Sequence, residues 1–342
     1  MQKFRFLKKG EKISLVAPSF GCTTEPYLTR TKVAIQNFQN LGYKVDVGPN
    51  VFINKLSARS NTARKCAKEF MDAYSSDSSL IISVGGGEIM CEILPFIDFK
   101  KLKKMPPKIF MGFSDNTNLT YTLTTISEVP TIYGPNFQTF AFLPFKNSTL
   151  DAYNLLTNKT KSIKGYPKWE RYPNREESII NPLSVSHLEE DKILKIFPKN
   201  KDFDVTGRLL GGCLDCLVTL CGTRFDETKS YLEKYREDGF IWFLEACDLN
   251  SLSIERALFQ LKEAGWFKYA KGFVFGRPLS YKQRILGIDH YKAIKDIIKD
   301  LNVPYIIDAD LGHFDPSMPF ISGERAHIYT KNGNINVTYL DL

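Results

Sequence analysis

The sequence predicts an α/β protein of two domains: an N-terminal doubly wound parallel-sheet domain and a β-rich C-terminal domain. Two observations support this prediction. Short apolar runs alternate with helical patterns over the first 150 residues, and the composition changes after about residue 150. In addition, a chain of 342 residues exceeds the usual size of one domain and suits two.

The first domain is predicted from strands that alternate with helices. Strand-like runs stand at 12–17, 43–48, 80–84 and 108–113, and helical patterns at 27–41, 59–75, 88–94 and 116–127. The run at 80–84 stops at the glycines of a turn, residues 85–87. This alternation favours a parallel sheet with helices on both faces.

The second domain follows a segment without regular pattern. Residues 159–182 are rich in Lys, Pro, Tyr and Glu, which is typical of a connecting loop. We therefore predict a first domain over 1–155, a linker over 156–182 and a second domain over 183–342. The later elements comprise strand-like runs at 239–246, 272–276, 304–310, 326–330 and 335–340, and helices at 251–264 and 289–301.

Composition narrows the class of partners and the compartment. The net charge of +8 is modest for this length and the lysines are scattered, so we expect no nucleic acid and no membrane as partner. The N-terminus lacks the apolar core of a signal peptide, and no apolar run approaches the roughly 18 residues that span a bilayer. Seven cysteines without an export signal favour reduced thiols. We expect a cytoplasmic protein.

Three polar side chains stand where apolar runs end or turn: Ser114 after KIFMGF, Glu245 after FIWFL, and His313 within DADLGHFDP. Catalytic groups collect at the carboxyl ends of parallel strands. Each residue also has a structural alternative. Ser114 or Asp115 can be a helix N-cap, Glu245 can pair with Arg256, and His313 can be a hydrogen-bonding turn residue.

Together these three residues supply the parts of a serine triad. A serine nucleophile needs a base, and the base needs a carboxylate that orients it. The surroundings of Ser114, GFSDN, are not the G-x-S-x-G nucleophile motif, so that motif gives no support. An oxyanion hole needs two N–H donors, which Asp115 and the glycine turn at 85–87 can provide. We expect these groups to meet in the cleft between the two domains.

Two other motifs point to weaker alternatives. VGGGE lacks the Lys-Ser/Thr of a P-loop and the spacing of G-x-G-x-x-G, so a phosphate-binding loop is disfavoured. Cys213 and Cys216 form a C-x-x-C pair, but a zinc site needs a second pair or added histidines. We interpret them as buried thiols at the start of an apolar helix, with a metal or redox role as the alternative.

Collinear segments along nearly the whole chain resemble a known family. They are SLVAPSFG (14–21), SVGGGEIMCEILPFIDF (83–99), PKIFMGFSDNTNLTYTL (107–123), TIYGPNF (131–137), GRLLGGCLDCLVTLCGT (207–223), WFLEACDLN (242–250), IERALFQLKEAG (254–265), GFVFGRP (272–278) and VPYIIDADLGHFDPSMPFISG (303–323). The sequence resembles the LD-carboxypeptidase family of serine peptidases, and especially its branch of microcin C immunity proteins.

The resemblance implies a role for each candidate residue. Ser114 is expected to be the nucleophile, Glu245 the triad carboxylate and His313 the base. Backbone amides of Gly86 and Asp115 are expected to form the oxyanion hole. The resemblance further implies an α/β N-terminal domain, a β-rich C-terminal domain, no metal or cofactor, and a homodimer.

Departures from the family pattern bear on the substrate. Murein-recycling members usually carry R-G-G-Y-G at the glycine turn, whereas residues 84–88 read VGGGE, which favours the immunity branch. That branch stacks aromatic side chains on a nucleobase. Trp169, Tyr166 and Tyr172 lie in the corresponding region, and Gly85, Gly87 and Trp169 are the expected substrate contacts; a solvent-shielding role is the alternative for the aromatics. A cysteine, Cys213, also stands where relatives often carry asparagine.

The expected function is that of a serine hydrolase that cleaves an amide-type bond in an aminoacyl- or peptidyl-nucleotide antibiotic of the microcin C type. One alternative is a murein L,D-carboxypeptidase that releases D-alanine from tetrapeptides. An alternative of another class is a non-catalytic protein that binds a peptide or nucleotide. The sequence therefore predicts a small peptide or aminoacyl-nucleotide as partner.

Overall fold

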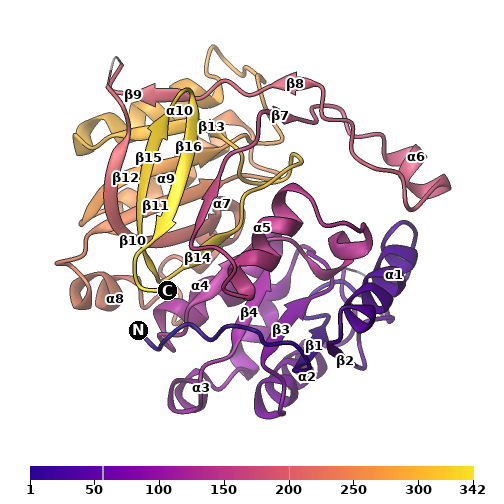
Figure 1. The fold of residues 1–342 in the computed structure, drawn as a ribbon. Coiled ribbons are helices and arrows are strands. Elements are labelled where there is room, and N and C mark those ends of the chain that lie inside the picture. The colour runs from indigo at the N-terminus through magenta and orange to yellow at the C-terminus, as the bar shows by residue number, and fades with distance from the viewer. Residues whose placement is uncertain (56–57, 200) are drawn as a thin grey trace.

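The computed structural model describes residues 1–55, 58–199 and 201–342. Two β-sheets, each covered by helices, divide the chain between them. Figure 1 shows the N-terminal elements, in indigo to magenta, beside the C-terminal elements, in orange to yellow. The predicted two-domain α/β fold is confirmed.

The first sheet is doubly wound, as predicted. Its strand order is β14-β5-β4-β3-β1-β2; β1 to β5 run parallel, and β14 is antiparallel to β5. The strands are β1 (Lys12–Val16), β2 (Lys44–Val47), β3 (Leu80–Ser83), β4 (Ile109–Gly112), β5 (Thr131–Tyr133) and β14 (Phe320–Ser322). In such sheets ligands bind at the carboxyl ends of the strands.

Helices cover both faces of this sheet. Helices α1 (Tyr27–Asn40) and α5 (Asn147–Leu156) pack on one face, and α2 (Ala63–Ser75), α3 (Phe99–Lys104) and α4 (Thr117–Thr125) on the other. Short 3-10 helices span Met90–Phe96, Ser114–Asn116 and Phe137–Ala141. Helix α2 begins later than the predicted residue 59 because Thr62 caps it, accepting a hydrogen bond from the backbone of Lys65.

The second sheet has the order β6-β16-β15-β10-β11-β12-β13-β9. Its central strands β10 to β13 are parallel and its outer strands are antiparallel. The strands are β6 (Ser162–Lys164), β9 (Lys195–Phe197), β10 (Asp204–Cys213), β11 (Phe240–Glu245), β12 (Ala270–Gly276), β13 (Tyr305–Ala309), β15 (Arg325–Lys331) and β16 (Asn334–Tyr339).

Helices of the second half cover one face of this sheet. They are α7 (Leu214–Leu220), α8 (Thr228–Lys234), α9 (Ser251–Glu263), α10 (His290–Ile298) and the 3-10 helix Lys299–Leu301. The segment predicted as a linker, 156–182, contains β6, which joins the second sheet, together with β7 (Lys168–Trp169) and α6 (Arg175–Ile180). Strand β7 pairs with β8 (Glu190–Asp191) in a separate ribbon.

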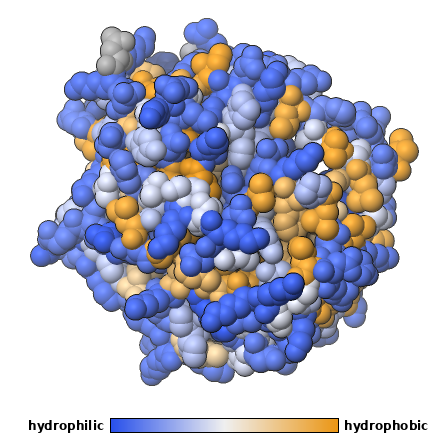
Figure 2. Space-filling view, viewed as in Figure 1, coloured by the Kyte–Doolittle hydropathy of each residue, from blue (hydrophilic) through white to orange (hydrophobic). Residues whose placement is uncertain are grey.

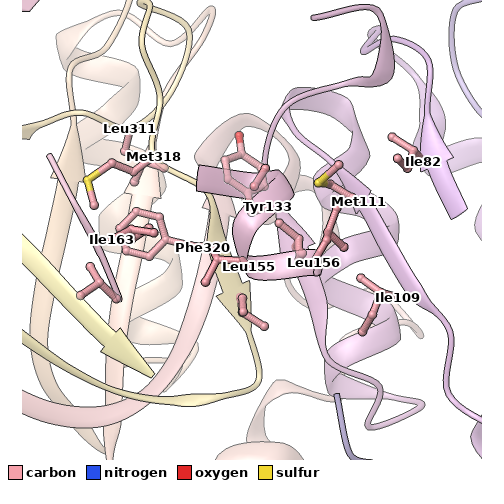
Figure 3. Packing of buried hydrophobic residues seen from close by; sticks show 14 of the residues in the cluster. Ile82, Ile109, Met111, Tyr133, Leu155, Leu156, Ile163, Leu311, Met318 and Phe320 are labelled. Carbon is pink, nitrogen blue, oxygen red and sulfur yellow. The ribbon is translucent and has the colours of Figure 1, made fainter. Parts of the chain in front are cut away.

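Two clusters of buried apolar side chains each span both halves. Figure 3 shows part of one of them, from Ile82 and Met111 of the first sheet to Ile163 and Leu311 of the second half. Phe320 of β14 stacks on Phe243 of β11, with ring centroids 5.0 Å apart. The loop between β13 and β14 is therefore anchored in the second sheet at one end and in the first sheet at the other.

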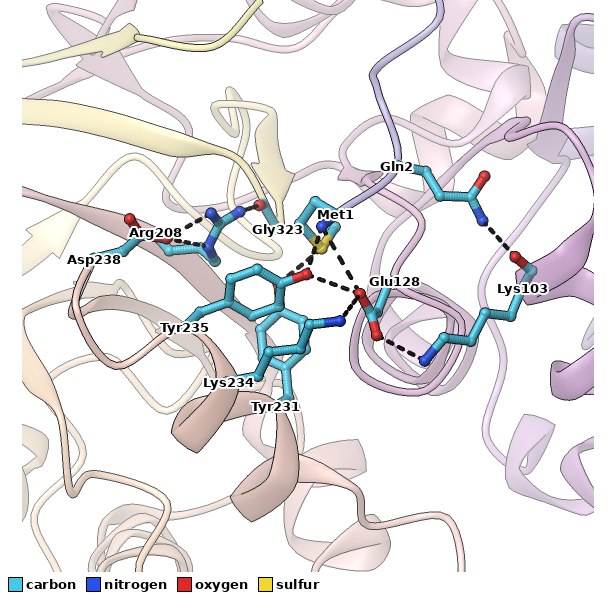
Figure 4. A network of polar contacts seen from close by, with 10 residues as sticks. All are labelled: Met1, Gln2, Lys103, Glu128, Arg208, Tyr231, Lys234, Tyr235, Asp238 and Gly323. Atoms are coloured by element: carbon cyan, nitrogen blue, oxygen red, sulfur yellow. Dashed lines mark hydrogen bonds and ion pairs between the residues drawn. The ribbon is translucent and has the colours of Figure 1, made fainter.

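A polar network also joins the halves. Glu128 of the first half accepts hydrogen bonds from Lys103 (2.6 Å), and from Lys234 (2.6 Å) and the Tyr235 hydroxyl (2.8 Å) of the second, as Figure 4 shows. Burial alone raises the pKa of Glu128, but these donors outweigh it and lower the pKa to about 2. The network thus stabilises the ionised carboxylate.

The surface is mostly polar. Figure 2 shows apolar side chains interrupting the polar surface on the right of the view, where Figure 1 draws α1 and α6. Exposed apolar residues around α6 include Ile179, Ile180 and Val185. Arg30 of α1 holds this segment through the carbonyls of Pro182 and Ser184. In the described parts of the chain, no helix combines the length and apolarity needed to cross a membrane.

The Glu128 network predicts a pH-dependent contribution to stability. Because folding lowers the pKa of Glu128, its contribution is present above the unfolded pKa near 4.5 and is lost as the pH falls toward about 2. Glu128→Gln should lower the free energy of unfolding by about 1–3 kcal/mol at pH 7. Urea unfolding of both proteins at several pH values measures the difference.

The matched control is Glu237→Gln, whose carboxylate is 91% exposed and pairs with the exposed side chain of its neighbour Arg236. It should change the free energy of unfolding by less than about 0.5 kcal/mol. If Glu128→Gln lowers the free energy of unfolding by the same amount at pH 7 and at pH 3, the ionised Glu128 carboxylate is not the source of the stabilisation.

Candidate active site

The three residues predicted from strand ends lie in direct contact. Ser114 Oγ is 2.9 Å from Nε2 of His313, and Nδ1 of His313 is 2.9 Å from Oε2 of Glu245. They come from three places: the end of β4, the end of β11, and the loop that joins β13 to β14. The serine, the imidazole and the carboxylate thus form a continuous chain of hydrogen bonds, with the serine from the first domain and the other two groups from the second.

Ser114 sits in a strained turn between β4 and α4. Its φ angle of +65° lies in the left-handed region, which is uncommon for residues other than glycine and is found at functional sites. Its backbone N–H donates to the hydroxyl of Tyr133 at 3.1 Å. The Ser114 side chain bonds to His313 and does not cap the helix.

Asp115 does not cap the helix either. Its carboxylate accepts hydrogen bonds from the hydroxyl of Ser19 (2.6 Å), the backbone of Met90 (2.9 Å) and the amide of Asn118 (3.0 Å). These three hydrogen bonds hold the Asp115 side chain, and with it the turn, in place. The backbone N–H of Asp115 is the first one after Ser114 in the chain.

Glu245 is a buried carboxylate. It is 2% exposed, and its oxygens bond to His313 and to the hydroxyl of Tyr133 (2.5 Å). The alternative partner Arg256 instead bonds to Ser253. Burial raises the pKa of Glu245, but the charge of His313 and the hydrogen bonds from His313 and Tyr133 outweigh it and hold the pKa below its ordinary value.

His313 is stabilised in its charged form. Burial alone lowers the pKa of His313, but the Glu245 charge, with hydrogen bonds to Cys247 and Glu245, raises the pKa well above its ordinary value. The ring of Phe113 lies 5.2 Å away, centroid to centroid. An imidazole must lose this proton before it can act as a base, so the site's reactivity depends on pH.

The glycine turn after β3 approaches Ser114 closely. A Cβ on Gly86 would lie 3.3 Å from both Cβ and Oγ of Ser114, and a Cβ on Gly87 would overlap the hydroxyl of Ser19. The carbonyl of Gly85 accepts a hydrogen bond from Asn116 at 2.9 Å, which fixes the turn. The backbone at Gly86 is thus adjacent to the point where an oxyanion would form.

A hollow opens beside Ser114 between the two domains. Four carboxylates lie in its wall, and none of the described residues that line it is lysine or arginine. Its lining consists of Gly87, Glu88, Cys91, Ser114, Asp115, Asn118, Cys213, Asp215, Cys216, Thr219, Cys247 and Asp248. Burial, followed by the charges of Asp248, Asp115 and Asp215, raises the pKa of Glu88. The hollow therefore attracts cations and repels anions.

The C-x-x-C pair forms part of this wall. The thiol of Cys213 donates to Asp215 at 3.2 Å, and that of Cys216 lies 3.8 Å from the carbonyl of Ser114. The hydrogen bond with Cys216, together with burial, raises the pKa of the Cys213 thiol well above its ordinary value. Both residues are therefore protonated thiols at neutral pH.

The predicted aromatic contacts lie outside the lining of the hollow. Trp169 is 2% exposed, packs edge-on against Tyr281 and Phe314 (5.0 Å between centroids), and carries the Arg277 guanidinium 4.6 Å above its ring. Tyr166 is buried, and its hydroxyl donates to Asp151. Tyr172 is 73% exposed beside Arg171. Two of the three contact the loop that carries His313: Trp169 packs on Phe314, and the backbone N–H of Tyr166 donates to Asp310.

Tyr133 was not predicted from the sequence. It ends β5, directly before Gly134, and contacts both Ser114 and Glu245. Like Ser114 and Glu245, it is a polar residue at the end of a parallel strand, and this signal could have identified it. The strand has only three residues, which made the pattern too short to detect.

Comparison with known proteins identifies the family of the chain. The model of the LD-carboxypeptidase N-terminal domain matches residues 13–134, and that of the LD-carboxypeptidase C-terminal domain matches residues 206–328. The microcin C7 self-immunity protein MccF of Escherichia coli is 27% identical over 291 residues, 82% of this chain and 80% of its own. A probable murein peptide carboxypeptidase of Bacillus subtilis is 24% identical over 96% of this chain and 92% of its own.

Solved structures share the fold over the whole chain. The crystal structure of an MccF-like protein from Bacillus anthracis superposes with a TM-score of 0.81 at 23% identity, covering 100% of both chains. The two family domains match in order, one on each half of the chain. The protein therefore belongs to the LD-carboxypeptidase family and is a serine peptidase of that family.

Proposed function

We propose that the protein hydrolyses the amide-type bond that joins an aminoacyl or peptidyl carboxyl group to a nucleotide, as in antibiotics of the microcin C type. The observation that carries the proposal is the continuous contact of Ser114, His313 and Glu245 at 2.9 Å per link. Such a chain activates a serine for attack on a carbonyl carbon.

Each residue has one step in the proposed mechanism. Ser114 Oγ attacks the carbonyl carbon while Nε2 of His313 takes its proton, and Glu245 stabilises the resulting imidazolium. The backbone N–H groups of Gly86 and Asp115 hold the oxyanion. His313 then protonates the leaving nitrogen, and the acyl group stays on Ser114. A water molecule, deprotonated by His313, releases the acyl group as a carboxylic acid.

The acidic hollow supports an aminoacyl substrate. An α-ammonium group is attracted by Glu88, Asp215 and Asp248, whereas the terminal carboxylate of a D-alanyl peptide is repelled. The similarity to MccF points the same way. Of the predicted substrate contacts, Gly87 lines the hollow, and Gly85 directly precedes Gly86, the glycine that lies against Ser114. Trp169 lies outside the hollow and packs on Phe314, in the loop that carries His313.

A murein L,D-carboxypeptidase is the second candidate function. The observation that favours it is the similarity, over 96% of the chain, to a probable murein peptide carboxypeptidase. A purely binding protein is disfavoured because the triad contacts are intact. A cytoplasmic location and a homodimer remain predictions.

Ser114→Ala should abolish turnover and leave substrate binding in place. Removal of a triad nucleophile costs at least about 1000-fold in kcat. Calorimetry of aminoacyl-sulfamoyl adenosine binding, beside a product assay, separates the two effects. The control, Ser230→Ala, alters an exposed serine of α8 and should retain parental turnover. Parental turnover in Ser114→Ala would refute the nucleophile.

The raised pKa of His313 predicts an acid limb in the rate profile. Since His313 must be neutral to accept the serine proton, kcat/KM should increase with pH and reach half its maximum above about pH 6.5. NMR titration of the His313 ring gives the same midpoint directly. Glu245→Gln removes the main cause of the shift and should move that midpoint to lower pH, whereas Glu237→Gln should not. A midpoint unaffected by Glu245→Gln contradicts the assignment.

Side-by-side assays with an aminoacyl-sulfamoyl adenosine and a murein tetrapeptide should show hydrolysis of the first. Release of D-alanine alone overturns the proposed substrate and favours the second candidate. Within the aminoacyl series, a lysyl compound should be preferred over a glutamyl compound because of the acidic wall. The double variant Glu88→Gln/Asp248→Asn should reduce this preference about threefold or more. If the double variant still prefers the lysyl compound to the same degree, the hollow does not recognise the aminoacyl group.

A further inference from the structure

We propose that Tyr133 is a positioning residue of the triad, whose hydroxyl ties the backbone of the nucleophile to the triad carboxylate. The proposal rests on the proposed serine mechanism and adds a fourth member to it. Tyr133 touches neither the imidazole nor the point of attack; it acts through Ser114 and Glu245.

The hydroxyl of Tyr133 acts both as a hydrogen-bond donor and as an acceptor. It donates to Oε1 of Glu245 at 2.5 Å and accepts from the backbone N–H of Ser114 at 3.1 Å. The side chain is 1% exposed, so water has little access to these bonds. A phenol has one donor, and here its orientation is fixed by the carboxylate. Burial, followed by the charge of Glu245, raises the pKa of Tyr133 well above its ordinary value, so the donor stays protonated.

The first consequence concerns Glu245. One carboxylate oxygen bonds to His313 and the other to Tyr133. A carboxylate held at both oxygens cannot rotate out of the plane that His313 requires. Tyr133 also withdraws part of the negative charge from the oxygen that faces His313.

The second consequence concerns Ser114. Its left-handed backbone costs about 1–3 kcal/mol and persists only where neighbours hold it. The bond from its N–H to Tyr133 is such a restraint. Because that N–H is occupied, it is not free to bind the oxyanion, and this leaves the role to the N–H groups of Gly86 and Asp115.

The third consequence concerns the domain boundary. Tyr133 lies in β5, between β4 and β14 in the first sheet, whereas Glu245 ends β11 of the second. Figure 3 shows Tyr133 between Met111 and Phe320, where elements of both halves meet. The centroid of its ring lies 5.9 Å from that of Phe243, which precedes Glu245 by two residues in β11. The hydroxyl therefore sets the distance between a nucleophile on one domain and a carboxylate on the other.

Tyr133→Phe tests the proposal with the ring retained. The variant should lose about 10- to 100-fold in kcat, the size of one hydrogen bond to a buried charge, with KM nearly unchanged. Without the hydroxyl, more negative charge faces His313, so the midpoint of its NMR titration should move to higher pH by roughly half a unit. Tyr121→Phe is the matched control, since its hydroxyl is also buried and bonds to Thr228, away from the triad. It should lower stability at most and leave kcat and the midpoint unchanged.

A 3-fluorotyrosine placed at position 133 keeps the protein testable if the phenylalanine variant does not fold. Fluorine makes the hydroxyl a stronger donor, so the His313 midpoint should move to lower pH. Parental kcat and an unmoved midpoint in both Tyr133 variants overturn the positioning role. If Ser114→Ala is inactive in the same assays, that result leaves the proposed function intact; if Ser114→Ala is fully active, the proposed function fails instead.

Discussion

The buried ion pair between Glu245 and His313 is the interaction on which the rest of the site depends. Removing a carboxylate from water costs several kcal/mol unless partners compensate for it. Glu245, 2% exposed, has two such donors, His313 and Tyr133. His313 in turn keeps its charge because Glu245 faces it. The nucleophile is oriented by this pair and not by helix capping.

The fold makes this pair possible because the chain crosses between the two sheets three times, the second time from β13 to β14. The loop that carries His313 leaves the second sheet at β13 and enters the first sheet as β14, next to the strand of Tyr133. The stacked rings of Phe320 and Phe243 lock this crossing within a core shared by both halves. Movement of one domain against the other would therefore have to break the core, and the distances within the triad are held by packing.

The sequence predicted what depends on local pattern. Alternating strands and helices predicted the doubly wound sheet, and polar residues at strand ends identified Ser114, Glu245 and His313. It did not predict β14, because a three-residue strand that pairs with a segment almost 190 positions earlier leaves no local signal. The acidic hollow was also hidden, since Glu88, Asp215 and Asp248 meet only in the folded chain. Trp169 was singled out by its residue type, but its burial depends on Phe314 and Arg277, which are distant in sequence.

Intact-protein mass spectrometry during turnover tests the central claim most directly. With an aminoacyl-sulfamoyl adenosine, rapid acid quenching should trap a protein heavier by one acyl group, and peptide mapping should place that group on Ser114. The account predicts that His313→Ala forms no such species. An acyl group on Cys216 or Cys247, the thiols beside Ser114 and His313, would contradict the serine mechanism, as would turnover in which no acylated protein forms.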